Sequence, residues 1–150
     1  MDKKAYFRRY ISKADTIEPF KPTPMQMTRA WNMINQCVFD GVLERPVLKI
    51  RYLPSAYGMC YAILCDGKEP RIKPYCQRIV LTPRFESKKH FIEVLSHEMV
   101  HQYQAEFQNR MDHGPTFWAW RDKLARFGIR LRMRCDASYP FEIIGIFPAR

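Results

Sequence analysis

Ser96-His97-Glu98-Met99-Val100-His101 contains two histidines four residues apart, with a glutamate directly after the first. On an α-helix, residues four apart are separated by only about 40° around the axis. Both imidazoles can therefore point at one metal ion, and the glutamate lies close enough to act on a water molecule bound there. The stretch predicts a divalent-metal site on a helix, in the arrangement typical of zinc peptidases.

The surrounding residues predict one long helix from about Lys88 to Asn109, with Ser87 as its N-cap. His90, in the first turn, is predicted to be solvent-exposed and not a ligand. Because apolar residues occupy most of the circumference of this helix, we expect it to be buried. Burying two histidines and a glutamate without partners would cost several kcal/mol, a cost that a metal or a hydrogen-bond network would remove.

A catalytic zinc ion usually has three protein ligands, so a third ligand is expected after His101. The candidates are Glu106, Asp112 and His113. Glu106 follows on the same helix and is rotated away from the histidine pair. His113 lies beyond the helix at Gly114-Pro115, where the backbone can fold back. We therefore prefer His113, with Asp112 as the alternative.

The other segments predict an α+β fold with three main helices and a small, mostly antiparallel sheet. The helix predicted over 88–109, called the metal helix below, is expected to be the buried one. Further helices are expected over 24–40 and over 116–127. Thr23-Pro24 is typical of an N-cap followed by proline at the first helical position. Residues 129–134 alternate apolar side chains with three arginines, which is typical of a strand. The predicted strands are 47–53, 57–64, 78–82, 129–134 and 139–147.

The composition is that of a globular protein, with 47% apolar and 14% aromatic residues. No apolar run approaches the roughly 20 residues that would span a membrane. The five cysteines include no C-x-x-C pair, so we expect thiols rather than a zinc ribbon or a disulfide scaffold. Without an apolar signal segment, the expected location is cytoplasmic or nucleoid-associated, or the host cytoplasm for a phage protein. We expect a monomer.

The formal charge is +10, yet residues 91–120, with one basic and four acidic residues, are net negative. A divalent cation suits this segment, and the basic flanks could attract a polyanion such as DNA. Residues 1–22 form a basic-aromatic arm ahead of a domain over 23–150; the arm either contacts nucleic acid or lies on the domain as an amphipathic segment. The candidate DNA contacts are Lys3, Lys4, Arg8, Arg9, Arg71, Lys73, Arg130, Arg132 and Arg134.

Two motifs together carry a family resemblance: the stretch Val94–Gln102 and the string His113-Gly114-Pro115-Thr116-Phe117-Trp118. With upstream pieces at 39–43, 56–60 and 79–82, they resemble the SprT-like metallopeptidases, the family that includes Spartan. The resemblance covers roughly residues 23–128. It implies a small zincin-like metallopeptidase domain that cleaves protein substrates.

Carried over by position, the resemblance implies that His97, His101 and His113 bind Zn²⁺ and that Glu98 is the catalytic base. Spartan relatives cleave proteins crosslinked to DNA, which implies a role in DNA repair. Many relatives carry a C-terminal cysteine zinc ribbon, whereas only Cys135 lies in that region here, so we expect a ribbonless form.

Two features of the mechanism stay open in the sequence. Tyr57, Tyr61 and Tyr103 are candidate donors to the oxyanion, and 57–64 is a candidate edge strand for holding the substrate backbone. A second function class is a non-catalytic, zinc-stabilised domain that binds nucleic acid or a protein partner. The intact Glu98 favours the enzyme, because a structural zinc site needs no base.

Overall fold

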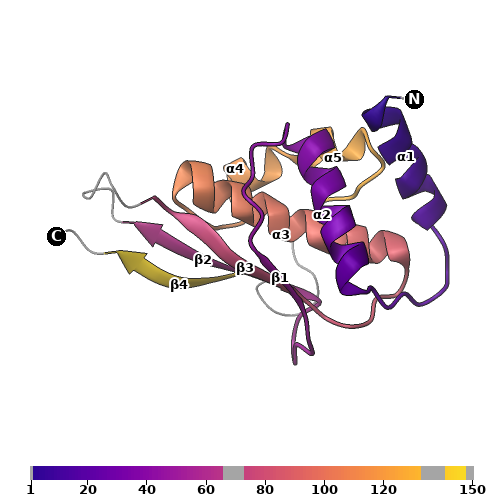
Figure 1. The fold of residues 1–150 in the computed structure, drawn as a ribbon. Coiled ribbons are helices and arrows are strands. Elements are labelled where there is room, and N and C mark those ends of the chain that lie inside the picture. Colours follow the sequence, from indigo (N-terminus) through magenta and orange to yellow (C-terminus); the bar gives the residue numbers. More distant parts are fainter. Residues whose placement is uncertain (1, 66–72, 133–140, 148–150) are drawn as a thin grey trace.

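The computed structural model describes residues 2–65 and 73–132, and the backbone of 141–147 (Figure 1). The α+β fold expected from the sequence is confirmed. None of the helices in these residues is long and apolar enough to cross a bilayer. The elements in chain order are α1 (Lys3–Ala14), α2 (Pro24–Val38), β1 (Val47–Ile50), β2 (Gly58–Cys65), β3 (Tyr75–Leu81), α3 (Lys88–Gln108), α4 (Pro115–Trp118), α5 (Arg121–Ala125) and β4 (Phe141–Phe147).

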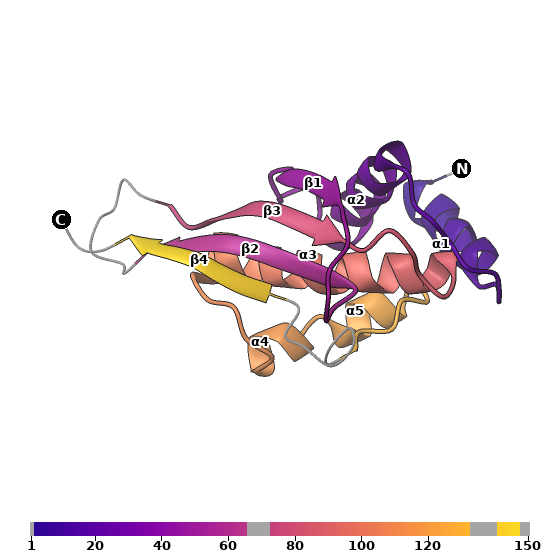
Figure 2. The same cartoon turned by 90° about the horizontal axis from the view of Figure 1, so that it is seen from below.

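The four strands form one sheet in the order β1-β3-β2-β4, which Figure 2 shows side by side. The pair β2 and β3 is antiparallel, but β1 runs parallel to β3 and β4 parallel to β2. The prediction of a mostly antiparallel sheet is therefore wrong. Strands β2 and β3 are consecutive in the chain and adjacent in the sheet, as in a hairpin. Strands β1 and β4 are joined to their partners by longer connections, which permit parallel pairing.

Pairing on both sides also overturns the candidate edge strand at 57–64. Strand β2 is hydrogen-bonded to β3 on one side and to β4 on the other. Its backbone groups are consequently used within the sheet and are not free to pair with a substrate chain.

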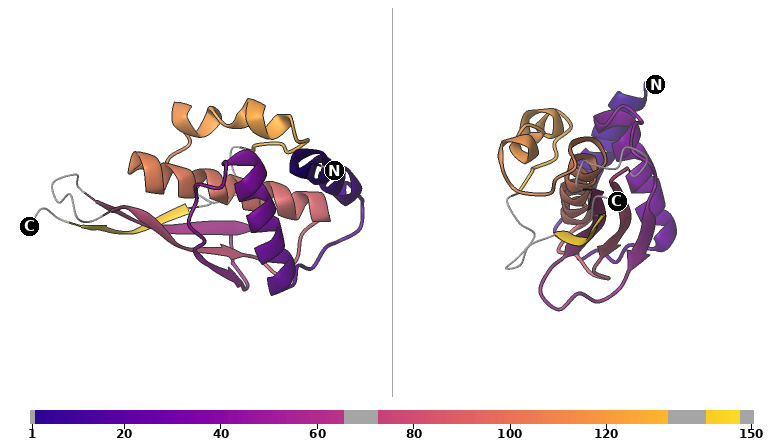
Figure 3. Two further views of the ribbon diagram at one scale, coloured as in Figure 1. Left: turned by 45° about the horizontal axis from the view of Figure 1, so that its top comes forward. Right: turned by 90° about the vertical axis from the view of Figure 1, so that its left-hand side faces the viewer.

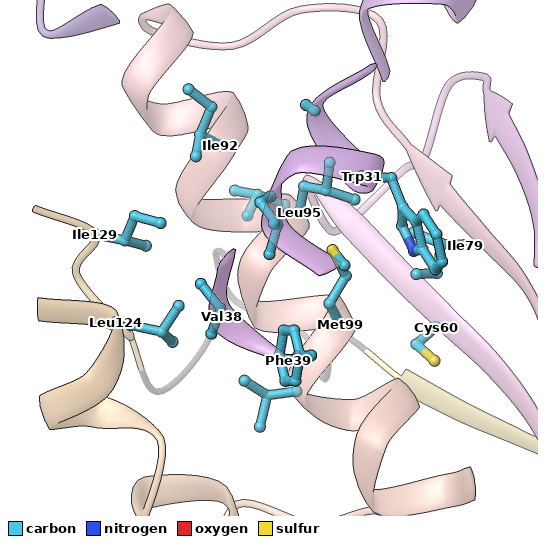
Figure 4. Packing of buried hydrophobic residues seen from close by; sticks show 14 of the residues in the cluster. Trp31, Val38, Phe39, Cys60, Ile79, Ile92, Leu95, Met99, Leu124 and Ile129 are labelled. Carbon is cyan, nitrogen blue, oxygen red and sulfur yellow. The ribbon is translucent and has the colours of Figure 1, made fainter. Parts of the chain in front are cut away.

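Helix α3 crosses one face of the sheet, and α4 and α5 lie on the side of α3 away from the sheet (Figure 3). Large apolar side chains fill the space between these layers. Figure 4 shows this packing for residues of four regions: Trp31, Val38 and Phe39 of α2 and its C-cap, Cys60 and Ile79 of the sheet, Ile92, Leu95 and Met99 of α3, and Leu124 and Ile129 from α5 and the segment after it. The metal helix is thus the central element of the core, as its apolar circumference predicts.

Both ends of α3 are as the sequence predicts. The Ser87 hydroxyl accepts a hydrogen bond from the His90 N–H at 3.0 Å, and Asn109 ends the helix in the left-handed conformation. The prediction that His90 is solvent-exposed is wrong, because it is only 6% exposed. Its Nδ1 atom accepts from the Glu86 N–H at 3.2 Å, and its ring packs edge-on against Tyr57 and Phe85.

Residues 1–22 contain a helix that packs on the rest of the protein. Phe7, Ile11 and Ala14 of α1 are buried, and the Phe7 ring lies 5.4 Å from that of Phe127. The spacing of these residues forms one apolar stripe along α1. The arm therefore lies on the domain as an amphipathic segment, and the basic side chains of α1 face outward, so that contact with nucleic acid stays a prediction.

The region after α3 differs from the sequence prediction in two ways. The helix expected over 116–127 is two short helices, α4 and α5, which meet at Ala119 and Trp120. The strand expected over 129–134 is absent from its described part, 129–132, although Ile129 and Leu131 are buried and Arg130 is exposed, as the alternation predicts. Hydrogen bonds to Glu93 of α3 and to the backbone of Leu124 in α5, rather than pairing with a strand, hold this segment. Met133 and Arg134 lie outside the described residues.

Candidate metal centre

Three histidines converge from two parts of the chain. His97 and His101 project from α3, and His113 comes from the loop before α4. Their Nε2 atoms form an equilateral triangle in which each side is 3.2 Å. His97 and His101 are fully buried, whereas His113 is partly open to solvent. The His113 side chain thus completes the group that the motif on α3 begins.

The triangle has the dimensions of a metal site. Tetrahedral zinc with Zn–N bonds of about 2.0–2.1 Å holds its nitrogen ligands about 3.3 Å apart. Burial lowers the pKa of all three histidines, and that of His101 falls to about 3. The rings are therefore neutral at pH 7, which is the form that binds a metal. The three-histidine group can hold a metal ion.

Gln104 orients one of these rings, and sequence reasoning missed it. Its Oε1 atom lies 2.9 Å from Nδ1 of His101, so Nδ1–H donates to it and Nε2 keeps its lone pair for the centre. The Nε2 atom of Gln104 donates to Asp112 at 3.2 Å and to Thr116 at 3.0 Å. Gln104 is fully buried in the structure, and no pattern in the sequence singled it out.

Asp112 shapes the loop that presents His113. Its carboxylate accepts from the Gly114 N–H at 2.9 Å and forms an ion pair with Arg110 at 2.9 Å. The alternative in which Asp112 is the third ligand is therefore not supported. Glu106 also lies elsewhere, since its Oε1 atom accepts from Gln102 at 2.9 Å.

Phe117 of α4 forms a common support for the three ligands. It is fully buried, and its ring centroid lies 4.8 Å from that of His97, 5.0 Å from that of His101 and 4.8 Å from that of His113. These contacts limit the orientations available to each imidazole. The string that begins at His113 thus supplies both a candidate ligand and the apolar side chain behind it.

Glu98 lies between α3 and β2. It is fully buried, and neither carboxylate oxygen has a hydrogen-bond partner among the described residues. A methyl group at Gly58 would lie 3.2 Å from Cγ of Glu98 and 2.8 Å from Cγ1 of Val94, so glycine is needed for β2 to approach α3 here. Burial raises the pKa of Glu98 well above its ordinary value. An unsatisfied buried carboxyl on the metal helix fits a group whose partner is a bound water molecule.

The three tyrosines considered as oxyanion donors have other neighbours in the structure. Tyr57 stacks on Phe85, Tyr103 stacks on Phe39, and the guanidinium of Arg78 lies 4.0 Å from the ring centre of Tyr61. These packing contacts explain the positions of the three rings, and they do not identify one of the tyrosines as the oxyanion donor.

The comparisons with known proteins agree with this geometry. The model of the SprT-like family matches residues 28–135, which include the whole of α3, the loop that carries His113, and α4. No curated protein and no solved structure matches the chain.

Proposed function

Because the chain belongs to the SprT-like family, we propose that it is a zinc-dependent endopeptidase. The observation that carries this proposal is the equilateral triangle of Nε2 atoms, two of which come from α3, together with a buried, unpartnered glutamate on that helix. A metal-binding group alone would be compatible with a structural site. The free carboxyl of Glu98 adds the general base that peptide hydrolysis requires.

In the proposed reaction, His97, His101 and His113 would hold zinc, and Gln104 keeps the His101 ring in the right tautomer. A zinc ion held there would supply a water molecule with a pKa of about 7 and a positive charge for the substrate carbonyl. Glu98 accepts the proton of the attacking water and later delivers it to the leaving amine. Burial raises the pKa of Glu98, which favours its holding the proton between the two transfers, while the positive charge of a bound zinc ion would favour the carboxylate that accepts it.

The proposed substrates are proteins bound or crosslinked to DNA. Support for DNA contact comes from α1, where Lys3, Lys4 and Arg9 are exposed. Of the other described candidates, Arg8 donates to the backbone of Arg126 and Arg132 pairs with Glu93, whereas the exposed side chains of Lys73 and Arg130 belong to two separate segments. Arg71 and Arg134 lie outside the described residues. We therefore assign DNA contact chiefly to α1.

The test combines metal content with proteolysis. The purified chain should contain one zinc ion, and it should cleave a DNA-binding protein such as a histone in a reaction that a chelator stops. Single-stranded DNA should increase the rate, and this increase should fall steeply with salt concentration. Tight zinc binding without cleavage of any protein, with or without DNA, would instead support the non-catalytic zinc-stabilised domain.

A further inference from the structure

The outer side of α1 carries tyrosines and cations at helical spacing. Tyr6, Arg9, Tyr10 and Lys13 lie within about 100° of one another around the helix axis, beside the apolar stripe that packs on the domain. Helix α1 contacts both α2 and α3 (Figure 3), and a hollow remains at each of these contacts. The reaction proposed above uses none of these side chains.

The hollow between α1 and α3, called the phosphate hollow below, has a volume of about 150 Å³. Its lining residues are Tyr6, Arg9, Tyr10, Lys13, Ala14 and Lys88, so every charged residue that lines it in the described part of the chain is basic. Sites for drug-sized molecules measure about 300–1,000 Å³. This hollow therefore suits one small group, and the three positive charges around it favour an anion such as a phosphate.

The three cations of the phosphate hollow have no acidic partner among the residues that the structure describes. The nearby carboxylate of Asp15 pairs with Lys89 instead, at 3.7 Å. Aromatic rings hold the ammonium group of Lys88 at the hollow, since its Nζ atom lies 4.6 Å from the ring centre of Tyr10 and 5.7 Å from that of Phe20. The positive charge is thus concentrated at the hollow and not neutralised there.

A second hollow, between α1 and α2, shares Tyr6 with the first. Its volume is about 340 Å³, and its lining residues are Lys3, Tyr6, Asn32, Met33, Gln36 and Cys37. Tyr6 is 56% exposed. Proteins that bind single-stranded nucleic acid combine cations along the backbone with exposed aromatic rings on which the bases stack. Tyr6 therefore stands where a base would lie if its phosphate occupied the phosphate hollow.

We propose that these two hollows form a binding site for single-stranded DNA, in which the three cations bind one backbone phosphate and an unpaired base stacks on Tyr6. This inference rests on the DNA contact in the proposed function, and it assigns that contact to a defined site and to single strands. The bases of a duplex are already stacked on one another, so they offer Tyr6 no free face.

The first experiment measures binding of a fluorescent oligothymidine to the purified full chain by anisotropy, separately from proteolysis. The triple variant Arg9→Gln/Lys13→Gln/Lys88→Gln should bind about tenfold or more weakly. Because one phosphate contact is lost, the slope of log K against log salt concentration should become shallower by about 0.7.

The matched control is the triple variant Arg45→Gln/Lys49→Gln/Arg51→Gln. It removes the same charge from exposed side chains on and beside β1, outside both hollows. It should keep the wild-type salt slope and most of the affinity. Equal losses in the two triple variants would mean that net charge alone attracts DNA, and would overturn the inference.

The second experiment removes the stacking surface. Tyr6→Ala should lower the affinity for the single strand about fivefold or more, keep the salt slope, and leave the affinity for duplex DNA unchanged. Tyr6→Phe keeps the ring and should bind like wild type. Wild-type affinity of Tyr6→Ala for the single strand would exclude stacking and overturn the inference. Since Tyr6 is exposed, this test also stands if the triple variant fails to fold.

Two further outcomes are informative. If vesicles containing phosphatidylserine bind through the three cations and the oligonucleotide does not bind, the hollow takes a lipid headgroup and the DNA site is refuted. A chain that binds single strands as expected but cleaves no protein would support this site and refute the proposed protease. A chain that cleaves proteins but whose DNA binding is unaffected by these changes would refute this site alone.

Discussion

At the scale of single residues, Glu98 is the side chain on which peptide hydrolysis depends. Replacing it by glutamine keeps the shape and the burial but removes the base. Glu98→Gln should therefore retain zinc and lose activity by at least about hundredfold. Zinc content by atomic absorption and initial rates of cleavage test this together. Wild-type rates in the variant would exclude Glu98 as the base.

Gly58 determines how closely β2 approaches the metal helix. A Cβ atom there would lie 2.8 Å from Cγ1 of Val94 and 3.0 Å from Cδ2 of Leu81, both in the core. Gly58→Ala should lower the free energy of unfolding by about 1–3 kcal/mol, because overpacking forces these side chains to shift. Urea denaturation provides the measurement. Lys49→Ala, at an exposed position in the same sheet, should change the stability by less than about 0.5 kcal/mol.

At the scale of secondary-structure elements, the contact between α3 and the loop before α4 runs through Gln104. Gln104→Leu keeps the volume but leaves Nδ1 of His101 and the side chains of Asp112 and Thr116 without this partner. We expect zinc affinity to fall by about 10–100-fold. Gln108→Leu, at the exposed end of the same helix, is the control. Equal affinities in the two variants would show that Gln104 does not orient the ligand.

The helices were the elements best predicted, because their signals are local. Thr23 and Gln26 form the capping box of α2, and Ser87 caps α3, as short-range patterns indicate. The break between α4 and α5 and the loss of the strand at 129–132 were not foreseen. The alternating burial at 129–132 is equally compatible with a paired strand and with an extended segment. In the structure the segment is unpaired, and it is hydrogen-bonded to Glu93, 37 and 39 residues earlier in the chain.

At the scale of the whole molecule, stability should depend on pH through Glu106. Burial raises the pKa of this carboxyl to about 7, and the nearby charge of Glu44 contributes to the rise. The folded protein therefore binds this proton more tightly than the unfolded chain does. The stabilisation is complete below about pH 4.5 and is lost as the pH rises towards 7.

Glu106→Gln should remove this part of the pH dependence and make the protein more stable than wild type at pH 8. Urea denaturation of both proteins at pH 5, 6, 7 and 8 provides the comparison. Parallel stability curves for the two proteins over this range would show that Glu106 titrates normally.

Zinc should also stabilise the whole fold, because its proposed ligands join α3 to the segment before α4. A ligand that binds only the folded state at a free concentration about 100 times its Kd adds about 2.7 kcal/mol. For a chain of this size, that corresponds to a rise in Tm of about 5–10 °C, since each kcal/mol is worth about 2–4 °C. Calorimetry with zinc and with a chelator measures the difference. An unchanged Tm would mean that the ion does not bind the folded protein tightly.

The sequence by itself determined the metal helix and the residues that form the candidate site, because helical spacing, end caps and a Gly-Pro turn depend on residues close together in the chain. It also indicated the family through two short motifs that lie close together in the chain, since His113 follows His101 by only twelve residues. Tertiary structure alone decided the parallel pairings of β1 and β4, the burial of His90, and the hydrogen-bond partners of the buried Gln104 and Glu93. Gln104 and Glu93 acquire their partners from loops that reach α3 only after folding, and no local pattern specifies which buried polar groups will meet.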